Sequence, residues 1–228
     1  MSNVELSPLE KKLVDRLIAL KPKNLLELGC GDGRKLIYLN QNSDIHVMGI
    51  DIYEPFIKDL QKAGIDAQIG DARKLPYPEK SVDWVLIANS LHHVANPNKM
   101  ISAAMKVAKI GVIVVDPWYD KTIYSQELTA ELSAWFKKLH QSLGFFHREG
   151  LSAGEIVAAI EDDISELEVY YELILEELEI NEFLEPQQQY IKELKANHYL
   201  LWELNQIKNK LNGKFLSKPG QVVVIIKK

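Results

Sequence analysis

The sequence contains almost no cysteine and no apolar run long enough to cross a membrane. Cys30 is the single cysteine among 228 residues, so the chain can form neither an internal disulfide nor a multi-thiolate metal site. The longest apolar stretches, such as Val222 to Ile226, fall far short of the ~20 residues of a membrane span, and the amino end lacks a hydrophobic signal core. With 46% hydrophobic and 26% charged residues, the composition excludes collagen-like, low-complexity and wholly disordered classes. We therefore expect a packed cytoplasmic protein with no membrane span.

Basic residues are missing from one long segment. Residues 149–191 contain no Lys or Arg but hold 13 of the 32 acidic residues, so the rest of the chain has 27 basic against 19 acidic residues. The lysines of that remainder are scattered and do not form one stripe with interleaved aromatics, which argues against a nucleic-acid partner. The acidic segment is best explained as a solvated helical face, or as a lid that discourages polyanions.

Short apolar runs alternate with amphipathic segments through the first half of the chain. The apolar runs predict strands at 24–28, 46–51, 67–69, 82–88, 110–116 and, near the end, 221–226. Helices are predicted at 8–20, 34–39, 54–64 and 97–108, and the first has a capping box from Ser7 to Glu10. Such alternation, with nearly continuous apolar strands, is typical of a parallel sheet with helices on both faces, an α/β doubly wound fold.

The pattern changes beyond residue 120. Helices are predicted at 126–143, 153–160 and 187–211, whereas 165–175 reads as a strand by its β-branched and aromatic residues or as a helix by its glutamates. We favour a strand for its first half. The length predicts a single domain, 1–228, with a core at 20–120 and 215–228 and a helical insertion at about 121–214. We expect this insertion to pack over the carboxyl edge of the sheet, where α/β folds bind ligands.

A glycine-rich turn follows the first predicted strand directly. Residues 25–33 read LLELGCGDG, and glycines spaced two apart allow the backbone to turn sharply and a ligand to approach closely. Asp51 stands 22 residues after Gly29, at the end of the second strand, where a carboxylate can accept hydrogen bonds from both hydroxyls of a ribose. The turn and the acidic residue together predict a cofactor of the adenosine type.

Two cofactor classes fit such a turn, and the spacing separates them. Nicotinamide dinucleotides prefer G-x-G-x-x-G, whereas here the third glycine comes one residue early and Arg34 occupies the dinucleotide position. Glu27 and Asp32 bring two carboxylates to the turn, which disfavours a doubly negative pyrophosphate. A cofactor with an amino group and a sulfonium suits these carboxylates better.

Four motifs in order resemble the class I S-adenosylmethionine-dependent methyltransferases, specifically the small-molecule subgroup that includes ubiquinone and menaquinone biosynthesis enzymes. The motifs lie between Asn24 and Asp116 and read ELGCGDG at 27–33 with Asp51, GDA at 70–72 with LPYP at 75–78, SVD at 81–83, and SLHHV at 90–94 before Pro97. The resemblance implies S-adenosylmethionine as cofactor and a seven-stranded Rossmann-like sheet in the order 3-2-1-4-5-7-6, with the last strand antiparallel.

The resemblance also implies which residues bind the cofactor. Glu27 would help place the methionine amino group, Asp51 would hold the ribose, and Asp71 would accept a hydrogen bond from the adenine amino group. The backbone of the glycine turn would lie against the cofactor, Ile52 and Ala72 would contact the adenine, and the end of the fourth strand would border the methionine portion. The complete implied set is Glu27, Gly29, Gly31, Gly33, Asp51, Ile52, Asp71, Ala72, Ala88 and Asn89.

His92 and His93 are the candidate catalytic residues. If the acceptor is a hydroxyl or an acidic carbon, a base must take its proton, and an imidazole with an ordinary pKa near 6.5 suits that task. The alternative is that the two histidines have no catalytic role and only cap the fourth predicted strand and line the entrance to the site. Because adjacent histidines are expected to point in different directions, we expect no metal site.

The expected activity is methyl transfer from S-adenosylmethionine to a small-molecule acceptor. The aminotransfer signature Asn-Pro-Pro-Tyr is absent, since residues 88–91 read ANSL, which disfavours methylation of DNA adenine or of a protein amide. Two alternatives stay open: an RNA or protein methyltransferase, and a noncatalytic S-adenosylmethionine-binding protein that stabilises a partner.

Overall fold

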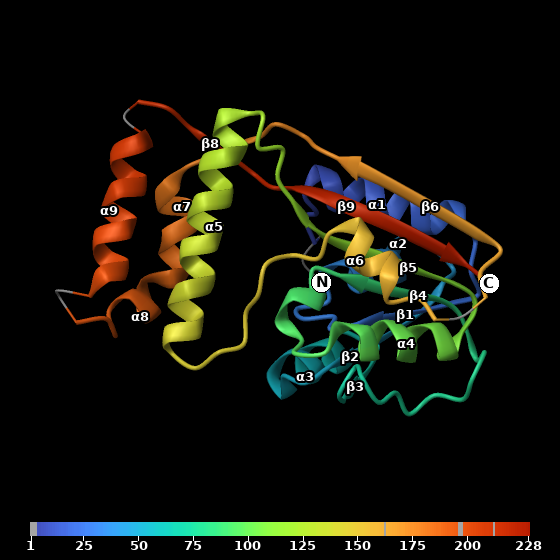
Figure 1. Ribbon diagram of the computed structural model, residues 1–228. Coiled ribbons are helices and arrows are strands. Elements are labelled where there is room, and N and C mark those ends of the chain that lie inside the picture. Colours follow the sequence, from blue (N-terminus) through green and yellow to red (C-terminus); the bar gives the residue numbers. More distant parts are fainter. Residues whose placement is uncertain (1–3, 162, 196–197, 212) are drawn as a thin grey trace.

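A seven-stranded sheet forms the centre of the computed structural model, which describes residues 4–161, 163–195, 198–211 and 213–228 (Figure 1). Its strand order is β3-β2-β1-β4-β5-β9-β6. Strand β9 runs antiparallel to both β5 and β6, and the other neighbouring pairs are parallel. Because β7 and β8 lie in a separate small sheet, the predicted order 3-2-1-4-5-7-6 with an antiparallel last strand is confirmed. The strands are β1 (Asn24–Leu28), β2 (His46–Asp51), β3 (Asp66–Ile69), β4 (Val82–Ala88), β5 (Ala108–Trp118), β6 (Glu166–Glu172) and β9 (Gly220–Lys227).

Helices cover both faces of this sheet. One face packs against α1 (Pro8–Ala19), α2 (Arg34–Asn42) and α3 (Glu54–Lys62), and the other against α4 (Pro97–Val107) and α6 (Ala153–Ala158). Successive side chains of β9 alternate between these two cores, Val223 and Ile225 into the first and Val222, Val224 and Ile226 into the second. A strand that is buried on both faces has apolar side chains at successive positions, which explains the uninterrupted apolar run in β9.

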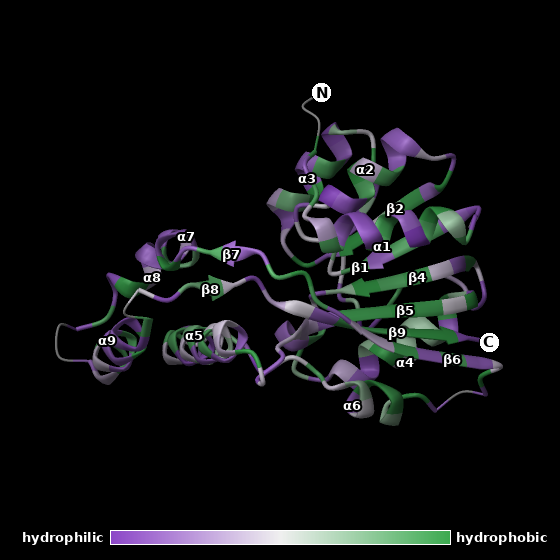
Figure 2. Ribbon diagram, turned by 90° about the horizontal axis from the view of Figure 1, so that it is seen from above, coloured by the Kyte–Doolittle hydropathy of each residue, from purple (hydrophilic) through white to green (hydrophobic). Residues whose placement is uncertain are grey.

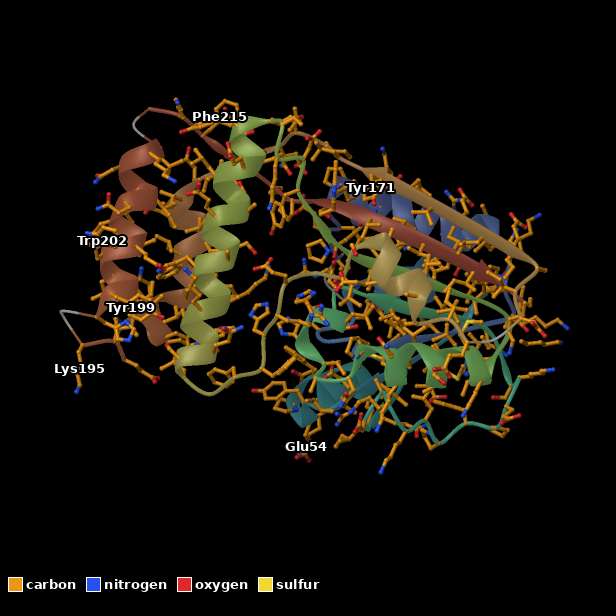
Figure 3. The ribbon with its side chains drawn as sticks, in the orientation of Figure 1. Glu54, Tyr171, Lys195, Tyr199, Trp202 and Phe215 are labelled. Atoms are coloured by element: carbon orange, nitrogen blue, oxygen red, sulfur yellow. The ribbon has the colours of Figure 1, made fainter. Side chains whose placement is uncertain are left out.

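A separate helical unit lies beside the carboxyl ends of the parallel strands (Figures 1 and 2). It has its own apolar core, in which Trp135 is fully buried and donates from Nε1 to the carbonyl of Leu200 at 2.7 Å. On its outer side Tyr199 and Trp202 are exposed (Figure 3). Its elements are α5 (Tyr124–Ser142), β7 (Glu177–Leu178), α7 (Ile180–Leu184), η2 (Glu185–Gln187), α8 (Gln188–Ile191), α9 (Tyr199–Leu211) and β8 (Leu216–Ser217).

The region after residue 120 differs from the sequence-based expectation in one helix. The single helix expected at 187–211 is wrong, since α8 ends at Ile191 and α9 begins only at Tyr199, with residues 196–197 outside the described part of the chain. Ile191 and Leu194 both pack on the helical core, but Leu194 does so from a turn, so their apolar side chains did not require a helix.

The expected insertion at 121–214 contains a strand of the main sheet. Its residues 166–172 form β6, which confirms the strand favoured for the first half of 165–175. The division of the chain into a core and an insertion stays a prediction. No helix within the described ranges is both long and apolar enough to cross a membrane.

Candidate active site

A cavity of about 570 Å³ opens at the carboxyl ends of β1, β2 and β4, within the usual range for a ligand pocket. We call it the glycine-turn cavity. Parallel strands end at the same edge of a sheet, so the loops after them meet there. Seven of the ten residues implied to bind a cofactor line this cavity: Gly29, Gly31, Asp51, Ile52, Asp71, Ala72 and Asn89.

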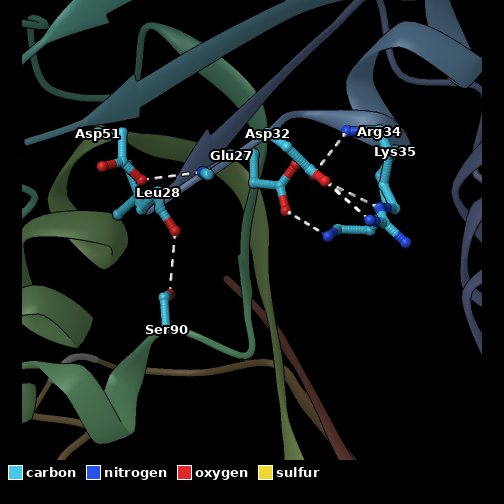
Figure 4. A network of polar contacts seen from close by, with 8 residues as sticks. Glu27, Leu28, Asp32, Arg34, Lys35, Asp51 and Ser90 are labelled. Carbon is cyan, nitrogen blue, oxygen red and sulfur yellow. Dashed lines mark hydrogen bonds and ion pairs between the residues drawn. The ribbon is translucent and has the colours of Figure 1, made fainter. Parts of the chain in front are cut away.

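The glycine turn is held close to the end of β4. Gly29 has a φ of +65°, and a Cβ placed on it would lie 2.6 Å from Cβ of Ser90. Ser90 in turn donates from its hydroxyl to the carbonyl of Leu28 at 3.1 Å (Figure 4). Gly31, with a φ of +55°, would carry its Cβ into open space that borders the cavity. Gly29 therefore allows the backbones that follow β1 and β4 to lie close together, whereas Gly31 leaves room for a ligand.

Asp51 is fixed by the backbone at both of its oxygens. Oδ2 accepts from the N–H of Gly31 and Oδ1 from the N–H of Tyr53, each at 2.9 Å. Each carboxylate oxygen keeps a further acceptor direction, because an ionised carboxylate accepts about four hydrogen bonds. The side chain is thus oriented before any ligand arrives, as the binding of a ribose diol requires.

Asp71 is paired with Arg73 at the other end of the cavity. Hydrogen bonds from the Arg73 side chain and then from its backbone N–H lower the pKa of Asp71 to about 2, so the carboxylate is charged at neutral pH. Nearby, the side chain of Ile52 is 78% exposed, and Phe56 adds a second apolar surface. A carboxylate that accepts hydrogen bonds, next to exposed apolar side chains, fits the amino group and the flat ring of a purine.

Three of the implied cofactor residues do not line the cavity. Glu27 is fully buried and pairs with Lys35, whose Nζ lies 3.1 Å from Oε1 (Figure 4). Burial raises the pKa of Glu27, and the charge of Lys35 opposes that shift. Gly33 would place a Cβ 2.2 Å from Leu60, so the glycine allows α3 to pack closely, and Ala88 packs in the sheet core.

Sequence reasoning missed several apolar residues of this cavity. Phe56, Met100 and Phe146 line it, and Phe146 comes from the loop between α5 and α6, far along the chain. Phe146 is 49% exposed and lines the cavity. The aromatic run Phe145-Phe146-His147 was the available signal.

A second cavity of about 370 Å³ adjoins the first, and His93 lines both. We call it the histidine cavity, because four histidines line it, together with Tyr119, Ser133, Phe136 and Lys137: His92, His93, His140 and His147. Burial raises the pKa of Tyr119. Lys137 is buried and pairs with Glu149 at 2.7 Å.

The two adjacent histidines lie together, contrary to the expectation that they would diverge. Their ring centroids are 4.3 Å apart within the tight turn η1 (Leu91–His93), and His147 lies against both, at 5.4 Å from His92 and 4.4 Å from His93. Nδ1 of His92 is 2.9 Å from Oδ1 of the fully buried Asp116. The sequence-based expectation considered the pair alone, without the third imidazole that the fold brings to it.

Two imidazoles of this group are neutral at physiological pH. Desolvation and then repulsion from neighbouring histidines lower the pKa of His93 to about 4 and that of His147 to about 3. Each neutral ring therefore has one N–H and one nitrogen with an available lone pair.

Comparison with known proteins connects this geometry to a family. Residues 26–115 match the family described as "Methyltransferase domain". Ajmaline N-methyltransferase of Rauvolfia serpentina is 29% identical over 103 residues, which cover 42% of this chain and 35% of that protein. The 27-O-demethylrifamycin SV methyltransferase of Amycolatopsis mediterranei is 34% identical over 112 residues, 44% of this chain and 41% of that protein. The chain thus spans less than half the length of these curated relatives.

Solved structures share the fold over nearly the whole chain. The YcgJ protein of Bacillus subtilis has a TM-score of 0.64 at 15% identity and covers 96% of this chain and 99% of its own. A SAM-dependent methyltransferase from Archaeoglobus fulgidus has a TM-score of 0.58 at 19% identity and covers 96% and 94%. At these identities the likeness establishes the fold alone. Residues 26–115 are thus similar to a methyltransferase domain, and the sheet order and the glycine turn at its edge agree with that match.

Proposed function

We propose that the protein transfers the methyl group of S-adenosylmethionine to a small-molecule acceptor held in the histidine cavity. The observation that carries this proposal is the pair of adjoining cavities with His93 in the wall of both. A donor in one cavity and an acceptor in the other would meet at that wall. S-adenosylmethionine supplies, when bound, a methyl group on a positively charged sulfur that a nucleophile can displace.

The chain's own residues would contribute mainly by positioning. Asp51 would hold the ribose, Asp71 and Ile52 the adenine, and the backbone around Gly29 and Asn89 the methionine portion. Methyl transfer to a nucleophile is an in-line displacement, so holding the two reactants aligned away from water supplies much of the acceleration. His92 and His93 stay our candidates for taking a proton from an acceptor that must lose one.

The size and lining of the histidine cavity favour a small acceptor. About 370 Å³ holds a compact molecule, and Phe136, Tyr119 and Phe183 offer aromatic faces to it. The names of two relatives specify small molecules, ajmaline and 27-O-demethylrifamycin SV. We further propose the small-molecule subgroup that includes ubiquinone and menaquinone biosynthesis enzymes, and a cytoplasmic location.

A nucleic-acid acceptor is the competing proposal, because the human "Probable tRNA methyltransferase 9B" is 27% identical over 43% of this chain and 22% of its own length. An RNA substrate needs basic side chains free to meet phosphates. Around the two cavities, however, Arg73 is paired with Asp71 and Lys137 with Glu149. A noncatalytic cofactor-binding protein would need no acceptor cavity beside the glycine-turn cavity.

A variant that fills the histidine cavity tests the proposal. Ser133 lies on α5 and lines this cavity, whereas Ser142 ends the same helix, is exposed and lines neither cavity. We expect Ser133→Phe to lose methyl transfer to a panel of small amines, phenols and thiols, followed by release of S-adenosylhomocysteine, and to keep its affinity for that product. Ser142→Phe should retain both. Equal turnover in the two variants, or turnover with tRNA alone, would contradict the proposal.

A further inference from the structure

Four of the six histidines of the chain gather in one place, although they come from three separate segments. In the part of the chain that the structure describes, one nitrogen from each of His92, His93 and His147 lies within 4.8 Å of the others. We propose that His92, His93 and His147 form a binding site for a divalent transition-metal ion, Zn²⁺ by its ligand chemistry, at the boundary of the two cavities.

Asp116 holds the imidazole ring of His92 in the way that carboxylates hold metal-binding histidines. Nδ1 of His92 lies 2.9 Å from Oδ1 of Asp116, so the tautomer that donates from Nδ1 satisfies this contact and leaves Nε2 for a metal ion. Metal-binding histidines typically donate their other ring N–H to a carboxylate in this way, which fixes both the tautomer and the ring. The second oxygen of Asp116 accepts from the backbone N–H of Leu151 at 2.8 Å, so the carboxylate itself is held in place.

The loop that carries His147 is fastened beside the other two ligands. The N–H of Arg148 donates to the carbonyl of His92 at 3.0 Å, and the Leu151 contact joins the same loop to Asp116. On its far side His147 meets His140, with their Nδ1 atoms 3.0 Å apart. Three backbone segments distant in sequence are thereby held around one point by hydrogen bonds that do not involve the free ring nitrogens of His92 and His93.

The ligand set favours zinc among the common metals. Imidazole nitrogens suit Zn²⁺, Cu²⁺, Fe²⁺ and Ni²⁺, whereas Mg²⁺ and Ca²⁺ prefer oxygen. Zn–N bonds of about 2.0–2.1 Å in a tetrahedron place the nitrogens roughly 3.4 Å apart, so the side chains need to draw together by at most about 1.5 Å.

Three protein ligands leave a fourth zinc position open, as in catalytic zinc sites. All three histidines line the histidine cavity, so that position would face the molecule bound there. Zinc would lower the pKa of a hydroxyl or thiol bound at that position, so that the group would release its proton to solvent water without a free imidazole as base. This activating role rests on the proposed function, whereas metal binding itself does not.

Metal titration of the full chain tests the site without any methyl donor. After treatment with a chelator, the protein is titrated with Zn²⁺ in a calorimeter and with Co²⁺ by visible absorption, which distinguishes tetrahedral nitrogen ligation. We expect one ion per chain and a tetrahedral Co²⁺ spectrum. His93→Ala is the first variant, because His93 is exposed and its loss leaves the core intact, and it should weaken binding at least tenfold. Asp116→Asn should weaken it about 10- to 100-fold.

His46→Ala is the matched control, since His46 is exposed and lies at the opposite end of β2 from the cavities. It should bind Zn²⁺ as the unmodified chain does. Absence of saturable binding near one ion per chain would overturn the site, and so would equal affinities of the His93 and His46 variants. Zinc binding without methyl transfer would instead retain the site and contradict the proposed function.

Discussion

The close approach of the glycine turn to the end of β4 makes a sharp prediction about Gly29. An added Cβ would lie 2.6 Å from Cβ of Ser90, an atom fixed to the backbone that no rotamer change can move away. The residue would also keep a φ of +65°, which costs a residue with a Cβ about 1–2 kcal/mol. Forcing the two strands' ends apart adds about 1–3 kcal/mol, the usual range for overpacking.

Gly64 separates these two contributions. It has a φ of +81°, but a Cβ placed on it meets no atom within 4 Å. Gly64→Ala should therefore lower the free energy of unfolding by about 1–2 kcal/mol and Gly29→Ala by about 2–5 kcal/mol, as measured by urea denaturation. Adding Ser90→Gly to Gly29→Ala removes the opposing Cβ and should recover part of the difference. Equal losses in the two alanine variants, with no recovery in the double variant, would refute the steric argument.

Two further predictions concern the buried interior. Lys35→Met leaves Glu27 buried without its counter-charge, which should cost about 3–5 kcal/mol of unfolding free energy at neutral pH, and Glu27→Gln in the same chain should recover much of it. Because burial raises the pKa of Glu27 above its unfolded value, ionisation opposes folding, so the Lys35→Met defect should grow as pH rises from acid to neutral; a pH-independent defect would contradict this. Trp135→Ala should destabilise the helical unit by about 3–5 kcal/mol in urea, since it empties a fully buried site and removes the hydrogen bond from Nε1 to the carbonyl of Leu200. A loss below about 1 kcal/mol would show that this core is not needed.

The sequence predicted the sheet because its signals are local and mutually consistent. Each apolar run between 24 and 116 became a strand within about two residues, and the box from Ser7 to Glu10 caps the first helix as expected. The position of Asp51 beside the glycine turn also followed from the pattern, because strand ends meet at one edge of a parallel sheet. The strand order was implied by family resemblance and did not follow from periodicity.

The helical unit and the histidine group were beyond local reasoning. Short elements such as β7, β8 and α7 are stabilised by packing around Trp135 and have no periodic signal of their own. His147 joins His92 only through contacts between a loop and a turn more than fifty residues apart. Likewise, the burial of Glu27 against Lys35 depends on how α2 packs on β1, which a motif does not specify.

The most direct test of the account is the affinity of the glycine-turn cavity for S-adenosylhomocysteine, measured by calorimetry in matched aspartate variants. Asp51 lines the cavity, whereas Asp32 lies in the same turn, pairs with Arg34 and does not line it. Loss of one or two charge-assisted hydrogen bonds is worth about 1.5–3 kcal/mol, so Asp51→Asn should weaken binding about 10- to 150-fold. The affinity of Asp32→Asn for S-adenosylhomocysteine should stay within about twofold of that of the unmodified chain, a difference in binding free energy smaller than RT. Equal affinity of the two variants, or a preference of the unmodified chain for nicotinamide dinucleotides, would contradict the assignment of this cavity to the methyl donor.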